Sequence, residues 1–297
     1  MNKVKLGNAV GESFLYIIMI FTAIITLYPF LNITAISFND YLDTVKGGVT
    51  IWPRVPTLRN YEHVLKNELL VVGLRNSILR TVIGTILSLG STTMLAYVIS
   101  RKDFILRRVI SLAFVITMYV SGGMIPEYLL MLKLKLANTF YVYLIPGLIG
   151  AWNLFVIRSY IDGLPESLQE SAKIDGANDI IIFAKIIVPL CVPVLATIGL
   201  FYAVGQWNSW FDTYIYCGSN DQLTTLQYEL MKILSATNVE AMSASLDVEA
   251  MKRQAVKISP ESIRMAITVV VTTPILLVYP FIQKYFVKGI TIGAIKG

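Results

Sequence analysis

Residues Glu170–Leu190 read ESAKIDGANDIIIFAKIIVPL, and this stretch changes from charged to apolar along its length. Pro165, just before it, suits the first turn of a helix, and Gly176 can take the positive φ that ends one. Asn178 is then a good N-cap for a second helix, which continues through an apolar run toward Pro189. The sequence therefore predicts a short helix, a bend at Gly176 and a second helix that forms a rigid link into an apolar segment.

The composition places this stretch in a membrane protein. Of the 297 residues, 55% are hydrophobic and 15% are charged, and the mean hydropathy is +0.65. A soluble domain has too little interior to bury so much apolar surface, whereas a bilayer accepts it on the outside. The net charge of +6 comes from basic residues at the ends of apolar runs rather than from one basic patch, so no nucleic-acid partner is expected.

Six apolar runs in the sequence are long enough to cross a lipid bilayer, which needs roughly 17–25 residues. We therefore expect an all-α, polytopic membrane protein with six transmembrane helices in a single domain, residues 1–297. The expected spans are residues 13–39, 81–100, 109–132, 136–157, 186–211 and 265–283.

Basic residues in the short loops set the expected orientation. They precede the first span, follow the second, separate the fourth from the fifth and follow the sixth, as Lys3, Lys5, Arg101, Lys102, Arg107, Arg108, Arg158, Lys173, Lys185, Lys284, Lys288 and Lys296. The positive-inside rule makes these segments, and with them both termini, cytoplasmic. Lys133 and Lys135 in an opposing loop are a weaker, competing signal. The segments between spans are then a cytoplasmic loop at 158–185, a cytoplasmic tail at 284–297 and outer loops at 40–78 and 212–263.

Catalytic and nucleotide-binding patterns do not occur in the sequence. No G-x-x-x-x-G-K-[ST] pattern is present to hold nucleotide phosphates, and the glycines of Gly84–Gly90 suit helix packing better. His63 is the only histidine and there is no C-x-x-C pair, so neither a metal site nor histidine-based catalysis is expected. We expect a chain that is not an enzyme and binds no cofactor itself.

The cytoplasmic loop offers a surface that a partner could contact. Helical spacing places Leu168, Ser171, Ala172 and Asp175 near one another, and the small residues allow a close approach. The Glu170 carboxylate beside them could pair with an arginine or lysine of a partner. Periodicity alone fits a solvated connector equally well.

The same loop resembles the EAA signature of ABC importer permeases, E-A-A-x3-G-x9-I-x-L-P. The matching residues are Glu170, Ser171, Ala172, Gly176, Ile186, Val188 and Pro189. Ser171 and Val188 depart from the usual alanine and leucine but keep their size and character. The resemblance implies a type I ABC importer fold and an ATPase-subunit docking site at Glu170, Ser171, Ala172, Asp175, Gly176 and Ala177.

The resemblance covers nearly the whole chain and points to the smaller permease subunit of maltose-type carbohydrate transporters. The segment Val287–Gly297 resembles that subunit's glycine-rich tail, which implies an ATPase-interface role for Lys288, Gly289, Gly293 and Lys296; a frayed terminus is the simpler alternative. Two runs, Gly122–Pro126 and Phe201–Asp212, resemble importers of complex or acidic oligosaccharides.

The partners implied by the resemblance are a second, non-identical permease subunit and two ATP-binding subunits that carry the ATP and Mg. An extracellular solute-binding protein would deliver an oligosaccharide to the chain in a bacterial plasma membrane. The outer segment 223–260, with a helix expected near 225–234, is the surface suited to that binding protein.

A path for sugar needs aromatic faces and amides, and two of the expected spans offer both. The candidates are Trp152, Asn153, Tyr202, Gln206, Trp207 and Asn208. Amides at membrane depth are costly without partners, so they are expected to face the bundle interior. The aromatic residues also fit an interfacial belt, and the amides also fit structural hydrogen bonds, as do Asn32 and Asn76.

A stand-alone secondary transporter or channel for a polar solute is the alternative. Such proteins often carry ionisable residues inside their spans. The expected spans have essentially none in their centres and no inverted halves are visible, so the sequence favours the ATP-driven importer. A membrane-bound enzyme fits less well, because the spans hold no carboxylate pair.

Overall fold

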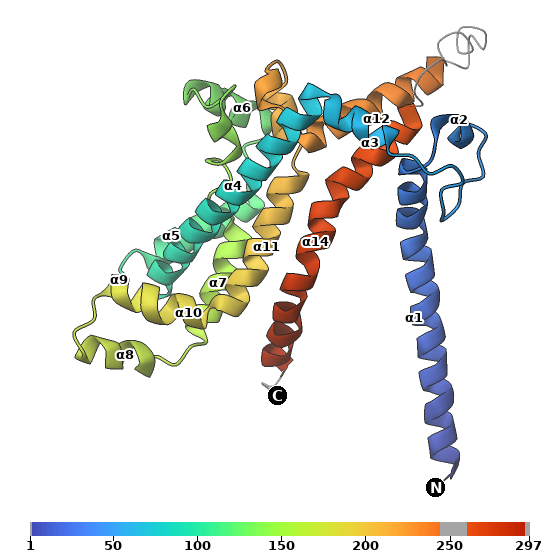
Figure 1. The fold of residues 1–297 in the computed structure, drawn as a ribbon. Helices are drawn as coiled ribbons and strands as arrows, with labels where there is room; N and C mark the ends of the chain where they lie inside the picture. Colours follow the sequence, from blue (N-terminus) through green and yellow to red (C-terminus); the bar gives the residue numbers. More distant parts are fainter. Residues whose placement is uncertain (1, 244–259, 295–297) are drawn as a thin grey trace. The chain divides into compact units, whose positions relative to one another are not determined.

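The computed structural model describes residues 2–243 and 260–294, and the regular elements in them are all helical (Figure 1). The chain divides into two parts, residues 1–68 with 230–273 and residues 69–229 with 274–297. The all-α fold predicted from the composition is confirmed.

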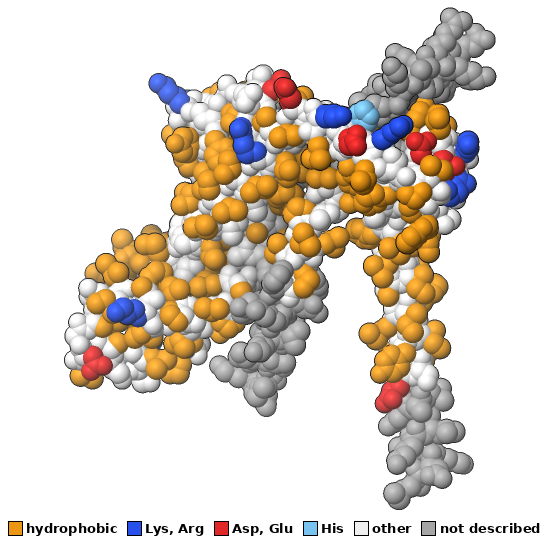
Figure 2. Space-filling view, viewed as in Figure 1, with side chains coloured by type: hydrophobic (Ala, Val, Ile, Leu, Met, Phe, Trp, Pro, Cys, Tyr) orange, Lys and Arg blue, Asp and Glu red, His pale blue; other side chains and the backbone are white. Residues whose placement is uncertain are grey.

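The first part begins with helix α1, Asn2–Ser37, followed by the shorter helices α2, Tyr41–Thr44, and α3, Arg59–Lys66. Apolar side chains are exposed along α1 from Phe14 to Leu31 (Figure 2). Such exposure is unfavourable in water and favourable in a bilayer, so α1 has the surface of a membrane span.

The segment after α1 is folded rather than an open loop. The buried Asn39 side chain donates to Oγ1 of Thr44 at 3.0 Å and accepts from the Val55 amide at 2.9 Å. The Asn32 amide donates to the carbonyls of Val49 at 2.9 Å and Thr50 at 2.8 Å. The expected outer loop 40–78 therefore contains α2, α3 and the beginning of the next helix, and Asn32 makes structural hydrogen bonds.

The second part has its core between α4, α7 and α11, where Ile99, Leu154, Ile157 and Ile198 are buried together. Its elements are α4 (Glu68–Ser100), α5 (Arg107–Tyr119), α6 (Met124–Lys133), η1 (Phe140–Tyr143), α7 (Ala151–Asp162), α8 (Ser167–Ile174), α9 (Asp179–Ile182), η2 (Phe183–Ile187), α10 (Val188–Leu190), α11 (Val192–Asn208), η3 (Thr213–Cys217) and η4 (Asp221–Leu223). Helices α12 (Leu226–Ser243) and α14 (Pro260–Ala294) each contribute to both parts.

Within the part of the chain that the structure describes, three helices are long and apolar enough to cross a membrane, at Gly11–Ser37, Glu68–Ser100 and Glu261–Val278. A fourth is present if Asp179–Leu190 and Val192–Asn208 count as one broken span, since they are bent by 82° from one another. These helices correspond to the first, second, sixth and fifth expected spans, and the second begins at Glu68 rather than at residue 81.

The third and fourth expected spans are not continuous helices in the structure. Residues 109–132 divide into α5 and α6 before Gly123, whose φ of 85° interrupts a right-handed helix. Residues 136–157 divide into η1, an irregular segment with Pro146 and Gly147, and α7. The division into six spans therefore stays a prediction.

The predicted link from the loop around Gly176 into α11 is present, but it is bent. The 82° bend falls at Cys191, between Pro189 and Pro193, and follows the π-helical turn η2. Proline removes a backbone donor and π turns misalign the helical hydrogen bonds, which accounts for the bend.

Candidate functional site

The loop around Gly176 has the local structure that its sequence predicts. Gly176 has a φ of 80° and ends α8. The Gly176 amide donates to the Lys173 carbonyl at 3.0 Å, and the Ala177 amide donates to the Ala172 carbonyl at 2.9 Å. These two bonds form a Schellman motif, in which glycine is the favoured residue because the position needs a positive φ.

The second arm of the loop begins at a side-chain cap. Oδ1 of Asn178 accepts from the Ile181 amide at 2.9 Å and starts α9. The predicted helix, bend and second helix are confirmed as structure. Figure 1 shows α8 at the end of the bundle formed by α4, α7 and α11.

The loop presents different residues inward and outward. Ala172 and Ala177 pack against the core, whereas Glu170, Ser171 and Asp175 are exposed. Among the described residues, none forms a hydrogen bond or ion pair with the Glu170 side chain.

Two isoleucines of the same loop are also exposed. Ile174 is 86% exposed at the end of α8 and Ile180 is 76% exposed on α9. Apolar side chains on a polar loop, next to a carboxylate available for pairing, have the character of a surface that another protein covers.

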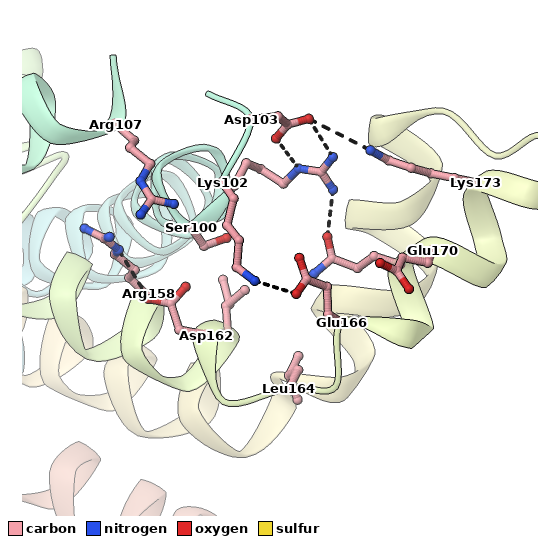
Figure 3. Close-up of a pocket in the computed structure, with 13 residues that line it drawn as sticks. Ser100, Lys102, Asp103, Arg107, Arg158, Asp162, Leu164, Glu166, Glu170 and Lys173 are labelled. Atoms are coloured by element: carbon pink, nitrogen blue, oxygen red, sulfur yellow. Dashed lines mark hydrogen bonds and ion pairs between the residues drawn. The ribbon is translucent and has the colours of Figure 1, made fainter. Parts of the chain in front are cut away.

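A charged cavity of about 390 Å³ lies between α8, the end of α7 and the loop after α4 (Figure 3). Lys102 contacts Glu166 at 2.5 Å across it, and Arg158 contacts Asp162 at 3.4 Å. The Arg101 guanidinium beside Asp103 holds the pKa of that carboxyl below its usual range. The Lys102–Glu166 pair joins the loop that follows α4 to the residue that precedes α8, whereas the Arg158–Asp162 pair lies within α7.

The structure brings three of the six candidate path residues together where α7 meets α11. The Tyr202 hydroxyl bonds to Oγ1 of Thr92 at 2.8 Å and accepts from the Gly150 amide at 3.0 Å, next to Asn153. The Trp152 ring lies 5.8 Å from the Phe201 ring and is 54% exposed.

The other three candidates lie apart from this group. The Gln206 side chain accepts from Arg80 at 3.1 Å and donates to the Tyr143 carbonyl at 3.1 Å. Trp207 is buried beside an apolar cavity of about 70 Å³ that Thr81 and Pro274 also line. Asn208 is exposed at the end of α11. Of the six residues, Trp207 is the one that lines this apolar cavity.

Arg80 is a buried residue that sequence reasoning missed. Its guanidinium is 2% exposed, pairs with Asp212 at 2.5 Å and lies 4.4 Å from the centroid of the Tyr143 ring. Arg80 lies one residue before the expected span 81–100, because that span was drawn to contain no charged residue. The sequence pattern that could have identified Arg80 is a stripe of small and polar residues at helical spacing along α4. All of them are buried in the structure: Gly73, Asn76, Ser77, Arg80, Gly84 and Ser88.

The same stripe explains two other residues of the sequence. The Asn76 amide donates to the carbonyls of Gln222 and Thr224, each at 2.8 Å, so its role is structural. A Cβ at Gly84 would lie 2.8 Å from Nε2 of Gln206, which confirms helix packing as the role of this glycine.

The candidate tail residues Lys288, Gly289 and Gly293 belong to helix α14, which continues to Ala294. The last span and most of the expected tail at 284–297 are therefore one helix in the described residues. Lys296 lies outside the described residues.

Comparison with known proteins shows which protein family this chain belongs to. The chain belongs to the family of binding-protein-dependent transport system inner membrane components, whose model matches residues 70–292. This confirms the resemblance to ABC importer permeases that the EAA-like loop indicated, and the family is one of membrane permeases rather than enzymes.

Individual members of the family and one solved structure are similar to this chain over nearly its whole length. The polygalacturonan/rhamnogalacturonan transport system permease protein YtcP of Bacillus subtilis (strain 168) is 35% identical over 98% of this chain and 99% of its own length. Protein LplC of the same strain is 36% identical over 92% of this chain and 90% of its own. A chain from the crystal structure of a bacterial ABC transporter involved in the import of the acidic polysaccharide alginate is 30% identical, with a TM-score of 0.82 over 96% of this chain and 98% of that one.

Proposed function

We propose that this chain is one permease subunit of an ATP-driven importer of oligosaccharides, and that the loop around Gly176 docks on its ATPase subunits. The observation that carries the proposal is the exposed surface at this loop, in which Glu170, Ile174 and Ile180 surround a rigidly capped bend. The docking residues are Glu170, Ser171, Ala172, Asp175, Gly176 and Ala177.

The proposed topology has six spans and both termini in the cytoplasm of a bacterial cell. The contacts between the loop after α4 and α8 support this arrangement, because Lys102 pairs with Glu166 and Lys173 lies 3.9 Å from Asp103. Loops that touch lie on the same side of a membrane, and positive-inside counting assigns both of them to the cytoplasm.

Energy for transport would come from two separate ATP-binding subunits that carry ATP and Mg. Closure of their dimer favours one of two global states, and a docked α8 ties the spans of this chain to that state. A second, non-identical permease subunit would complete the path. The outer segment 223–260, in which helix α12 begins, is the proposed contact for an extracellular solute-binding protein.

The proposed substrate is an oligosaccharide, and acidic ones are the first to test. YtcP is a permease of a polygalacturonan/rhamnogalacturonan transport system, and the structural neighbour belongs to a transporter involved in the import of the acidic polysaccharide alginate. Trp152, Asn153 and Tyr202 are the most suitable described path residues, because an aromatic face and an amide lie together there.

The test is uptake by the complete transporter in proteoliposomes, with labelled oligogalacturonate and a neutral malto-oligosaccharide outside. We expect ATP-dependent uptake that Glu170→Ala abolishes without loss of membrane insertion or of sugar binding by the outer protein. Glu166→Gln is the matched control, because its ion pair with Lys102 is exposed and such pairs contribute about 0–1 kcal/mol.

Two results would decide against this function. Normal uptake by Glu170→Ala would reject the docking role of the loop. Uptake by the purified chain alone, driven by an ion gradient without ATP, would favour a stand-alone secondary transporter.

A further inference from the structure

The Arg101 side chain reaches both arms of the loop around Gly176. Arg101 follows the last residue of α4, and its Nη1 donates to Oε1 of Gln169 on α8 at 2.7 Å. Its Nη2 lies 3.5 Å from Oδ1 of Asp179, the first residue of α9. Since Gln169 and Asp179 lie on opposite sides of Gly176, one guanidinium contacts the chain before and after the bend.

Two more contacts fix the plane of this guanidinium. Asp103 accepts from Nε at 3.2 Å and from Nη2 at 3.1 Å. The guanidinium carbon also lies 5.9 Å from the centroid of the Tyr97 ring on α4. An arginine can make these contacts together because its donors form a planar fork, which a lysine lacks.

Tyr97 extends the connection into the second arm of the loop. Its ring centroid lies 5.3 Å from that of Phe183 in η2, and both residues belong to the core around Ile182 and Ile187. The end of α4 is therefore joined to α8 and α9 through Arg101, and to η2 through Tyr97.

Arg101 is also the most sheltered cation among the ion pairs at this loop. Its side chain is 14% exposed, whereas Lys102 and Lys173 are 73% and 46% exposed. Exposed ion pairs contribute little because water and salt screen them, so the two lysines cannot hold α8 in place as firmly.

We propose that Arg101 is a positioning residue that holds α8 and α9 at a fixed angle across Gly176 and ties both to α4. Movement of α8 with a bound ATPase is then passed to α4 as well as to the segment that leads into α11. Without Arg101 the loop can bend at Gly176, so that α8 moves while the spans do not. This inference rests on the proposed docking function of the loop.

The experiment measures three quantities on the complete transporter in proteoliposomes: ATPase bound, ATP hydrolysed and sugar imported. For Arg101→Ala we expect bound ATPase and ATP hydrolysis to remain, and sugar imported per ATP to fall about tenfold, the scale of coupling between sites. Arg101→Lys should fall less, because one bond can re-form. Arg108→Ala is the matched control, since Arg108 is an exposed cation seven residues after Arg101. Sugar imported per ATP should not change in this variant.

A second variant separates positioning from folding. Gln169→Ala should also lower the amount of sugar imported per ATP. The double variant Arg101→Ala with Gln169→Ala should be no worse than Arg101→Ala alone, because both substitutions remove the same hydrogen bond between Arg101 and Gln169. An unchanged ratio in Arg101→Ala, or parallel losses of ATPase binding and uptake at a constant ratio, would overturn the proposal. If Arg101→Ala does not insert, an unchanged ratio in both Gln169→Ala and Arg101→Lys overturns it. Failure of the unaltered complex to import sugar with ATP would instead reject the proposed function.

Discussion

At the scale of single residues, Arg80 is the buried charged residue of α4. Its guanidinium holds Asp212, Gln206 and the Ser209 carbonyl together against the Tyr143 ring. A buried cation of this kind costs desolvation, which its partners offset only while all of them are present. We therefore assign Arg80 and Gln206 to holding α4, η1 and α11 together.

The first prediction follows from this network. Arg80→Met should destabilise the protein by about 3 kcal/mol, because it leaves the Asp212 carboxylate partly buried without its cation. The measurement is the unfolding midpoint in detergent. Arg75→Met, an exposed arginine of the same helix, is the control and should change it little. Asp212→Asn added to Arg80→Met should recover part of the loss, and a further loss instead would contradict the account.

Single residues also show what the sequence can and cannot predict. Gly176 and Asn178 were identified because a helix end depends on the backbone preferences of a few neighbouring residues. Arg80 was missed because its partner Asp212 lies 132 positions away and no local pattern specifies that pairing. The path candidates were selected by residue type, which does not say whether an amide such as Gln206 is already bound to the protein itself.

At the scale of elements, hydropathy found the apolar segments but not their breaks. The long helices α1, α4 and α14 were expected, because each has a continuous charge-free run. The interruption at Gly123 and the bend at Cys191 depend on backbone torsion and on proline, which a hydropathy average does not register. The bend also changes the account of coupling, since α9–α10 meets α11 at an angle and the packing with α4 offers a second route beside this bent junction.

The second prediction concerns the packing of α4. A Cβ on Gly73 would lie 3.0 Å from the Leu226 amide nitrogen and from the Thr225 carbonyl carbon, which are backbone atoms at the start of α12. Gly73→Ala should therefore destabilise the protein by about 1–3 kcal/mol, measured as an unfolding midpoint.

The control for this prediction is Gly90→Ala in the same helix. No atom lies within 4 Å of a Cβ at Gly90, and alanine is favoured over glycine in a helix by about 1 kcal/mol. It should leave the midpoint unchanged or raise it. Equal losses at both glycines would mean that α4 does not pack on α12 at Gly73.

At the scale of the whole molecule, the class was predictable and the detailed architecture was not. The EAA-like loop, the apolar composition and the sidedness of the basic residues agreed, and the family match confirms the permease class. The number of spans and the position of the sugar path depend on contacts that hydropathy does not encode, and on partner subunits that complete the transporter.

The central claim is that the loop around Gly176 docks on an ATPase subunit, and cysteine cross-linking tests it most directly. The two native cysteines, Cys191 and Cys217, are buried, so a cysteine introduced at an exposed position can be labelled selectively. Ser171→Cys should cross-link to the ATPase subunit of the assembled transporter, whereas Asp221→Cys, in the proposed outer segment, should not. A complex that hydrolyses ATP yet gives no cross-link from Ser171→Cys, or gives one equally from both positions, would contradict the account.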